Sequence, residues 1–271
     1  MMPVHHLPVR DTRLAVHTSG SGLPLLLLHA FPLDHSMWER QAPLAEHLRL
    51  IAPDLRGFGA STGSVPTSIA DLADDAVALL DALHVSRPVV VCGLSMGGYV
   101  AQHIAARHPD RVAALVLVDT KLEGDTPEAR AARADLAAKV GRVGQSILAD
   151  AMVPRLLAPF TADDRGGRRA IEESLRSIIV SQPVPTIQAA LAALGDRPDM
   201  TEAMRRVRVP TLLVVGADDQ ITPPSCLETA EQIIPRSRLL IVPGAGHMTP
   251  LETPDVFNSA LLEFLAEALA G

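Results

Sequence analysis

The sequence is poor in cysteine, lysine and aromatic residues. Of 271 residues, two are cysteines, two are lysines and 3% are aromatic, with one Trp and one Tyr. Two cysteines cannot supply a disulfide framework. So few aromatic side chains argue against a base-stacking nucleic-acid platform or an aromatic cage. The net charge of −7 offers no electrostatic footprint for a polyanion, so we expect no nucleic-acid partner.

Long apolar runs are also missing. The longest cover five to seven residues, as in Val112–Val118, whereas a membrane-spanning helix needs roughly 20. The first ten residues contain no apolar signal core, and no stretch has the Cys or His spacing of a metal site. We therefore expect a soluble, cytoplasmic protein that needs no membrane, cofactor or metal. The sequence does not indicate an oligomeric state.

Strand-like apolar runs alternate with helical patterns along most of the chain. Residues 4–10 and 14–18 predict a β-ribbon. Further strands are predicted at 25–29, 50–53, 88–93, 112–118, 211–215 and 239–242, and helices at 37–48, 68–83, 96–107 and 255–269. Continuous apolar strands separated by helices are typical of a parallel sheet covered on both faces. Right-handed crossovers make such a sheet doubly wound, and ligands bind at the carboxyl ends of its strands.

Residues 122–208 break this alternation. They show no convincing buried strand and predict about four helices rich in Ala, Leu and Arg. A segment of this length is too long for a loop. We expect residues 122–208 to form a helical cap, or lid, and residues 1–121 and 209–271 to form the core domain. The apolar residues of the cap suit either a substrate chamber or the cap's own core. They are Met152, Leu156, Leu157, Phe160, Ile178, Ile179, Ile187 and Leu191.

The strongest functional signal is Gly93-Leu94-Ser95-Met96-Gly97-Gly98, which joins a predicted strand to a predicted helix. The G-x-S-x-G pattern needs this context, because the chain turns sharply there and exposes the serine hydroxyl. Gly93 and Gly97 would remove side chains that collide where strand and helix pack closely. Ser95 would stand at a helix N-terminus, whose amides favour developing negative charge. An ordinary helix N-cap is the alternative interpretation of Ser95.

A serine nucleophile needs a base and an acid that orients the base. Among ten histidines, His247 alone follows a late strand and a turn, downstream of an acid, in the order Ser, Asp, His. Three acids follow predicted strands: Asp119, Asp218 and Asp219. The spacing Gly216-x-x-Asp219 favours Asp219, and Asp218 is explained as a turn residue. Asp119 is the fallback acid.

With these motifs the sequence resembles the serine α/β-hydrolases. The matching segments, in the family's order, are 29–32, 53–61, the Ser95 turn, 216–223 and 244–247 with Glu252 beyond. The likeness is to the small, capped bacterial branch of 3-oxoadipate enol-lactonases, cofactor-free haloperoxidase/perhydrolases and arylesterase-like carboxylesterases. The resemblance implies the α/β-hydrolase fold: a mostly parallel, eight-stranded sheet with a helical cap inserted after the sixth strand.

The resemblance also implies roles for individual residues. Ser95 would be the nucleophile, His247 the base and Asp219 its orienting acid. The backbone amides of Phe31 and Met96 would form the oxyanion hole. The substrate would be a small to medium carboxylic ester or lactone, cleaved through an acyl-enzyme that water hydrolyses.

Neighbouring residues would support this site. His29 would brace the oxyanion loop, while Asp54, Arg56 and Ser61 would knit the loop beside it. Ala30 departs from the family, which usually has Gly there; a methyl group would narrow the loop. Trp38 fits either the substrate pocket or the core.

Related activities either share this triad or need other residues. An enol-lactonase or a cofactor-free perhydrolase would use the same triad, and a non-catalytic ligand-binding homologue is the alternative of a different class. Epoxide opening and halide removal need a carboxylate nucleophile, and position 95 is Ser. A hydroxynitrile lyase needs Lys after the catalytic His, and position 248 is Met.

Overall fold

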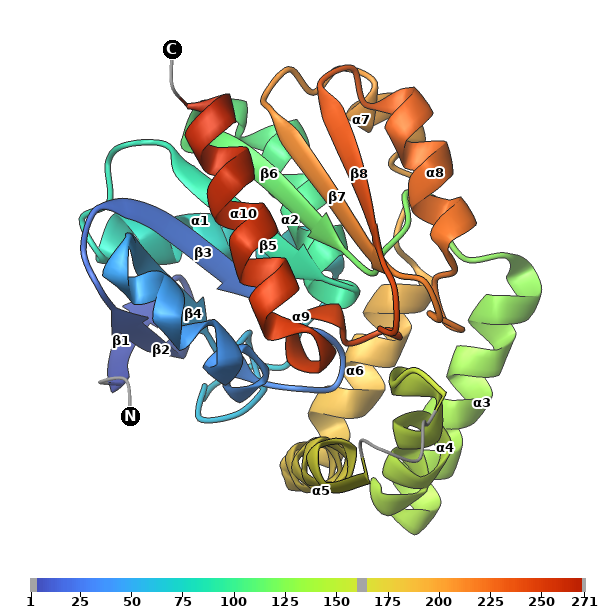
Figure 1. The fold of residues 1–271 in the computed structure, drawn as a ribbon. Coiled ribbons are helices and arrows are strands. Elements are labelled where there is room, and N and C mark those ends of the chain that lie inside the picture. The colour runs from blue at the N-terminus through green and yellow to red at the C-terminus, as the bar shows by residue number, and fades with distance from the viewer. Residues whose placement is uncertain (1–3, 160–164, 270–271) are drawn as a thin grey trace.

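A computed structural model of the protein describes residues 4–159 and 165–269. An eight-stranded sheet runs through it (Figure 1). In spatial order the strands are β1 (Val4–Val9), β2 (Thr12–Ser19), β4 (Leu48–Pro53), β3 (Leu23–Leu28), β5 (Val89–Leu94), β6 (Val112–Val118), β7 (Thr211–Gly216) and β8 (Ser237–Val242). β2 is antiparallel to both neighbours, and all other pairs are parallel. The predicted sheet is confirmed.

Helices cover both faces of the sheet, as its fully buried central strands require. α1 (Ile69–Ala82) and α2 (Met96–Arg107) pack together on one face, and α8 (Pro224–Ile233) packs on β7 and β8. The other face carries α10 (Pro254–Ala268), which crosses in front of the sheet in Figure 1. There α10 contacts α9 (Thr249–Glu252) and a 3₁₀ helix, η1 (His35–Glu46). A short 3₁₀ turn, η2 (Pro109–Arg111), leads into β6.

The helix predicted at 37–48 is present, and its bounds lie two residues earlier along the chain. The chain forms the 3₁₀ helix η1 over His35–Glu46, and Leu48 already begins β4. Pro43 lies inside η1 and has no N–H to donate to a preceding turn. The apolar spacing that predicted a helix fits a 3₁₀ helix, since residues three apart share its buried face, as Trp38, Gln41 and Leu44 do.

Helices alone connect β6 to β7 in the described part of this segment. They are α3 (Pro127–Val143), α4 (Ser146–Leu156), α5 (Arg165–Ser181), α6 (Val184–Gly195) and α7 (Thr201–Met204). α3 packs on α6 and α4 on α5, and these helices lie beyond the edge of the sheet where β6 ends (Figure 1). The short α7 instead contacts α2 and α8. The helical segment after the sixth strand is thus where the sequence predicted it.

A buried ion pair ties the two ends of this helical segment together. Arg197, which follows α6, lies 2.7 Å from Asp125, which precedes α3, and both side chains are 2% exposed. The guanidinium also lies 4.2 Å from the ring centroid of Tyr99 in α2. Removing one partner of such a pair leaves an uncompensated buried charge. The entry to and exit from α3–α6 are therefore fixed together against the helix that follows Ser95.

No single helix in residues 4–159 and 165–269 has both the length and the apolarity needed to cross a membrane. Residues 167–181 and 184–195 meet these requirements only as a pair, which is bent by 99°.

Candidate active site

Ser95 occupies the turn between β5 and α2. Its backbone has φ 52° and ψ −111°, a conformation that residues with a side chain rarely adopt. The turn is held from β6: the Ser95 amide donates to the Val118 carbonyl (3.0 Å), and Thr120 Oγ1 donates to the Ser95 carbonyl (3.0 Å). Backbone strain of about 1–3 kcal/mol persists only where the surroundings over-determine it. These bonds supply part of that constraint.

Close backbone packing explains the glycines around this turn. A Cβ on Gly93 would lie 2.0 Å from the Gly97 carbonyl oxygen, and one on Gly97 would lie 2.0 Å from the Leu28 carbonyl oxygen. No side chain fits at either distance. Gly97 thereby lets the first turn of α2 rest on the carboxyl end of β3, directly before the segment that contains Phe31.

The Ser95 side chain is presented rather than used to cap the helix. Ser95 holds the N-cap position of α2, but its side chain makes no capping hydrogen bond within the described chain. It is also partly exposed, while every other residue from 91 to 100 is buried. The N-cap interpretation of this serine therefore has no support in the hydrogen bonds.

His247 follows β8 and lies against Asp219, which follows β7. His247 Nδ1 is 2.8 Å from Asp219 Oδ2, and the two side chains are 3% and 0% exposed. Asp219 Oδ1 accepts hydrogen bonds from the amides of Ile221 (2.8 Å) and Thr222 (3.0 Å). Asp218, by contrast, is exposed. The structure therefore brings His247 together with the acid that the spacing favoured.

The charges around this pair decide its protonation. Burial disfavours the cationic ring, but the hydrogen bond and charge of Asp219 raise the pKa of His247 above its ordinary value, with smaller help from Asp119 and Glu252. Burial also opposes ionisation of Asp219, yet the bond to His247 and the two amides lower its pKa. An ionised Asp219 accepts the proton on Nδ1 as a hydrogen bond. Nε2 is then the ring atom that can take a proton from a substrate or nucleophile.

Asp119, the fallback acid, has other partners. Its Oδ1 accepts from the Gly216 amide (2.9 Å) and Thr249 Oγ1 (3.0 Å), and its Oδ2 accepts from the Thr249 amide (3.1 Å). Burial is the main cause that raises its pKa to about 7. Asp119 thus joins the end of β6 to the end of β7 and the start of α9. Its hydrogen bonds fix the frame around His247 rather than the imidazole itself.

Glu252 supports the loop that carries His247. The sequence placed Glu252 in a matching motif but indicated no role for it. Its Oε1 accepts from the amides of Gly246 (2.8 Å) and Met248 (3.2 Å), on either side of His247. Its Oε2 accepts from the amide of Ala158 (2.6 Å), directly after α4. Burial raises the pKa of the Glu252 carboxyl, although the three amides counteract it. The spacing of this acid after His247 was the signal in the sequence.

The predicted oxyanion loop follows β3. His29 is fully buried; its Nε2 accepts from the Leu55 amide (2.9 Å), and its Nδ1 lies 2.9 Å from the Ala30 carbonyl oxygen. These partners require a neutral ring with the proton on Nδ1, and burial lowers the His29 pKa accordingly. The Ala30 amide donates to Met37 Sδ (3.2 Å), and its methyl group is buried. His29 therefore braces the loop that carries Phe31.

Asp54, Arg56 and Ser61 stabilise the loop after β4, as the sequence predicted. Ser61 Oγ donates to the Asp54 carbonyl (2.6 Å), and Asp54 Oδ2 accepts from the Ala60 amide (2.8 Å). Arg56 is 2% exposed and pairs with Asp75 in α1, with Nε 2.6 Å from a carboxylate oxygen. This loop is consequently fixed to α1 and, through the bonds of Asp54 to His35, to the start of η1.

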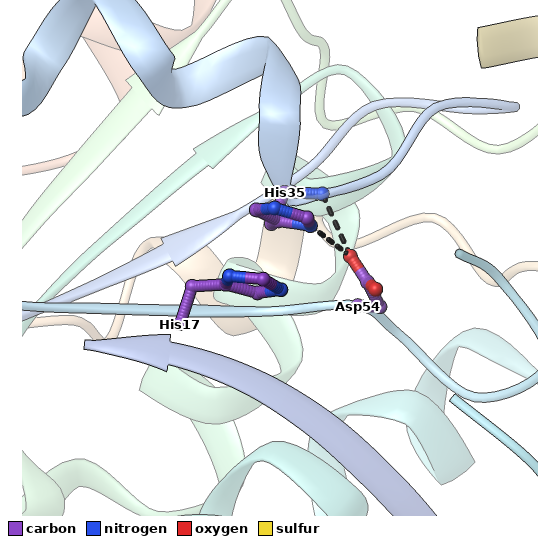
Figure 2. A group of neighbouring side chains, drawn as sticks. All are labelled: His17, His35 and Asp54. Carbon is purple, nitrogen blue, oxygen red and sulfur yellow. Dashed lines mark hydrogen bonds and ion pairs between the residues drawn. The ribbon is translucent and has the colours of Figure 1, made fainter. Parts of the chain in front are cut away.

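One group of described residues has the proximity of a metal site (Figure 2). The ligand atoms of His17, His35 and Asp54 lie within 4.8 Å of one another. The two rings are stacked with centroids 3.3 Å apart and planes 6° apart. Imidazole lone pairs lie in the ring plane, so those of parallel rings do not converge on one ion. Asp54 Oδ1 already accepts from the amide (2.9 Å) and Nδ1 (2.7 Å) of His35. The group is therefore better suited to holding the start of η1 against the loop after β4 than to binding a metal.

The sequence did not decide whether Trp38 and the apolar cap residues line a pocket or pack in a core. Trp38 is fully buried, with its ring 6.3 Å from that of Phe257, so it belongs to the core between η1 and α10. Phe160 lies outside the described residues. Five of the cap residues are buried: Leu156, Leu157, Ile179, Ile187 and Leu191. Met152 and Ile178 are partly buried.

Comparison with known proteins extends the likeness along the chain. The model of the Alpha/beta hydrolase family matches residues 25–260. The pimeloyl-[acyl-carrier protein] methyl ester esterase of Edwardsiella ictaluri is 31% identical over 258 residues, which are 92% of this chain and 95% of that protein.

Two solved structures are similar over nearly their full length. The thermophilic esterase from Thermogutta terrifontis is 36% identical, with a TM-score of 0.92, covering 98% of this chain and 99% of that one. The enol-lactonase from Burkholderia xenovorans LB400 is 28% identical, with a TM-score of 0.88, covering 97% and 100%. The sheet order, the strained serine turn and these matches agree with the resemblance seen in the sequence. This chain belongs to the alpha/beta hydrolase family.

Proposed function

We propose that the protein hydrolyses a small to medium carboxylic ester or lactone through an acyl-enzyme formed on Ser95. His247 is the base, and Asp219 holds its imidazole. The observation that carries the proposal is the buried His247–Asp219 pair, 2.8 Å apart, on the same sheet edge as the left-handed turn of Ser95. Ser95, Asp219 and His247 follow the carboxyl ends of β5, β7 and β8, where ligands bind in such sheets.

The first half of the reaction forms the acyl-enzyme. Ser95 Oγ attacks the carbonyl carbon while His247 Nε2 takes the hydroxyl proton. The amides of Phe31 and Met96 stabilise the oxyanion, and losing one such donor costs about 3–4 kcal/mol. His247 then gives its proton to the departing alkoxide. With an ester the alcohol leaves, and with a lactone it stays attached to the acyl chain.

The second half releases the acid. His247 deprotonates a water molecule, which attacks the acyl carbonyl, and the proton returns to Ser95 Oγ as the acyl group leaves. Asp219 favours both proton transfers because its charge stabilises the imidazolium formed in each. No step in this sequence requires a cofactor or metal.

The cap supports a preference for compact substrates. In this proposal residues 1–121 and 209–271 form the core, and residues 122–208 form the cap. α4 ends against the His247 loop, where the Leu156 carbonyl accepts from the His247 amide (2.9 Å). A roof this close to the base favours small esters and lactones over polymers or lipid aggregates. The names of the similar esterase and enol-lactonase support the ester and lactone class of substrate.

A substrate panel tests this function. Turnover of p-nitrophenyl esters graded by acyl length, with a set of lactones, is measured for the wild type and for Ser95→Ala. We expect turnover of short acyl esters or lactones by the wild type and none above background by the variant. Wild-type turnover no higher than that of Ser95→Ala on every compound would leave the non-catalytic ligand-binding alternative.

A further inference from the structure

The loop that carries His247 is fixed by its three consecutive amides. The amides of Gly246 and Met248 donate to Glu252 Oε1 at 2.8 and 3.2 Å. Between them, the His247 amide donates to the Leu156 carbonyl at 2.9 Å. Two of the three amides therefore depend on Glu252, and the third depends on the end of α4.

The same carboxylate also binds the chain that follows α4. Its Oε2 accepts from the Ala158 amide at 2.6 Å. The two segments touch directly as well, because a Cβ on Gly246 would lie 2.5 Å from the Ala158 nitrogen and 2.6 Å from the Leu157 carbonyl carbon. Residues 156–158 are called here the cap anchor. They bind the loop of residues 246–248 directly, through the His247 amide, and indirectly, through Glu252.

We propose that Glu252 is a positioning residue for His247. Through its hydrogen bonds, Glu252 couples the position of the imidazole to the position of the cap anchor on the core. This inference rests on the proposed function, in which His247 is the base. It implies that the cap anchor stays with the core during turnover. Any opening of the cap must then take place in its other elements.

The chemistry of the three donors requires a carboxylate. An ionised Glu has two acceptor oxygens with about four lone-pair sites, enough for three N–H groups. A Gln has one oxygen and an NH₂ group that would face an N–H donor. Replacing Glu252 by Gln therefore keeps the size of the side chain and breaks at least one of the three bonds. The loss falls either on the loop side or on the anchor side of Glu252.

Two properties of Glu252→Gln distinguish positioning from a purely structural role. We expect kcat to fall about 10- to 100-fold with KM nearly unchanged, because a displaced base slows the chemical step. The acid limb of the pH–rate profile should also move to lower pH. Among the described residues, the acids whose charges favour the cation of His247 are Asp219, Asp119 and Glu252. Loss of the Glu252 charge removes one of them.

Hydrogen exchange reports on the coupling directly. In Glu252→Gln the amides of residues 156–158 and 246–248 should exchange faster than in the wild type. Glu263→Gln is the matched control, because Glu263 is an exposed acid in α10 and the substitution makes the same change of charge. We expect Glu263→Gln to leave kcat, the pH profile and the exchange of both segments unchanged. Thermal unfolding of each variant checks that it is folded. If Glu252→Gln is not folded, Glu252→Asp, which keeps the charge but shortens the side chain, takes its place in the kcat and exchange measurements.

The outcomes separate this inference from the proposed function. Labelling of wild-type Ser95 by a fluorophosphonate reports on the function alone. If Ser95 is labelled while Glu252→Gln keeps the wild-type kcat, pH profile and exchange rates, the positioning role of Glu252 is overturned. If Ser95 is not labelled, the function fails, and with it the role of His247 as base. Exchange at residues 156–158 then still decides whether Glu252 holds the anchor.

Discussion

The turn that carries Ser95 and the loop that carries His247 are held in place by different means. At Ser95 the constraint is close backbone packing: Gly93 and Gly97 admit backbone contacts, with Gly97 itself and with Leu28 of β3, that any side chain would block. At His247 the constraint comes from hydrogen bonds to carboxylates, Glu252 nearby and two others far along the chain. Asp219 is 28 residues away, and Asp119 binds Thr249 across 130 residues.

This difference decides how each element responds to change. A turn fixed by close backbone packing has no spare volume, so adding one carbon there disturbs two strands and a helix at once. A loop fixed by hydrogen bonds to carboxylates can keep its shape when one partner changes. It then loses the orientation or charge that the partner supplied. The experiments below address one region or the other.

The largest expected effect is at the orienting acid. Asp219→Asn should lower kcat by about 10⁴-fold, because an amide favours the wrong imidazole tautomer and does not stabilise the imidazolium. Turnover of a short p-nitrophenyl ester measures the loss. Asp218→Asn is the control, because Asp218 is exposed and adjacent. Equal losses in the two variants would contradict the assignment of Asp219.

Adding a methyl group at the serine turn should affect folding as well as activity. In Gly97→Ala the Cβ would lie 2.0 Å from the Leu28 carbonyl oxygen, so β3 or α2 must shift. We expect a loss of about 1–3 kcal/mol or more in the free energy of unfolding, as for other overpacked sites, together with low kcat. Denaturant unfolding and ester turnover measure both.

Gly195→Ala provides the matched control for that substitution. A Cβ on Gly195, at the end of α6, would meet its nearest neighbour, Arg130 Cγ, at an ordinary 3.4 Å. We expect this variant to fold and turn over like the wild type. A Gly97→Ala protein as stable and as active as Gly195→Ala would show that close packing does not fix the turn.

Much of the serine side of the site could be predicted from sequence because its determinants are contiguous. Continuous apolar runs predict β5 and β6, and the glycines on either side of Ser95 report the close approach of strand and helix. The helix predicted at 37–48 forms over His35–Glu46 as a 3₁₀ helix, because apolar spacing indicates a buried helical face without fixing the helix type.

The histidine side could be predicted only in part. The order of motifs identifies His247, and spacing favours Asp219 over Asp218. The function of Glu252 depends on Ala158 lying beside Gly246, a contact between the cap and the core. No local pattern encodes such a contact, because it is set by how α4 packs after the chain has folded. The same is true of Asp119, whose donors belong to β7 and α9.

A smaller effect is expected at Asp119. It distinguishes a residue that supports the loops around His247 from the acid that binds the imidazole. Asp119→Asn keeps an acceptor for the Gly216 or Thr249 amide but turns an NH₂ group toward the other donor. We expect a loss of about 1–3 kcal/mol in the free energy of unfolding and a decrease in kcat far below that of Asp219→Asn. Denaturant unfolding and turnover are measured together. A loss of kcat as large as that of Asp219→Asn would make Asp119 the acid.

The pH dependence is the mildest probe of the histidine loop. His247 must be neutral to take a proton, and its pKa is raised above the ordinary imidazole value. Activity is therefore complete above this raised pKa and is lost as the pH falls through it. We expect kcat/KM for a neutral ester to decline on the acid side with a midpoint above that ordinary value. A flat profile between about pH 5 and pH 8, the range in which histidine titrates, would argue against a histidine base.

Covalent labelling tests the central claim, that Ser95 is a nucleophile activated by His247. The wild type, Ser95→Ala and His247→Ala are each treated with a fluorophosphonate, digested and mapped by mass spectrometry. The account predicts a single adduct on Ser95 in the wild type, none in Ser95→Ala and very slow labelling in His247→Ala. An unlabelled wild type, an adduct on another residue, or labelling of His247→Ala at the wild-type rate would contradict it.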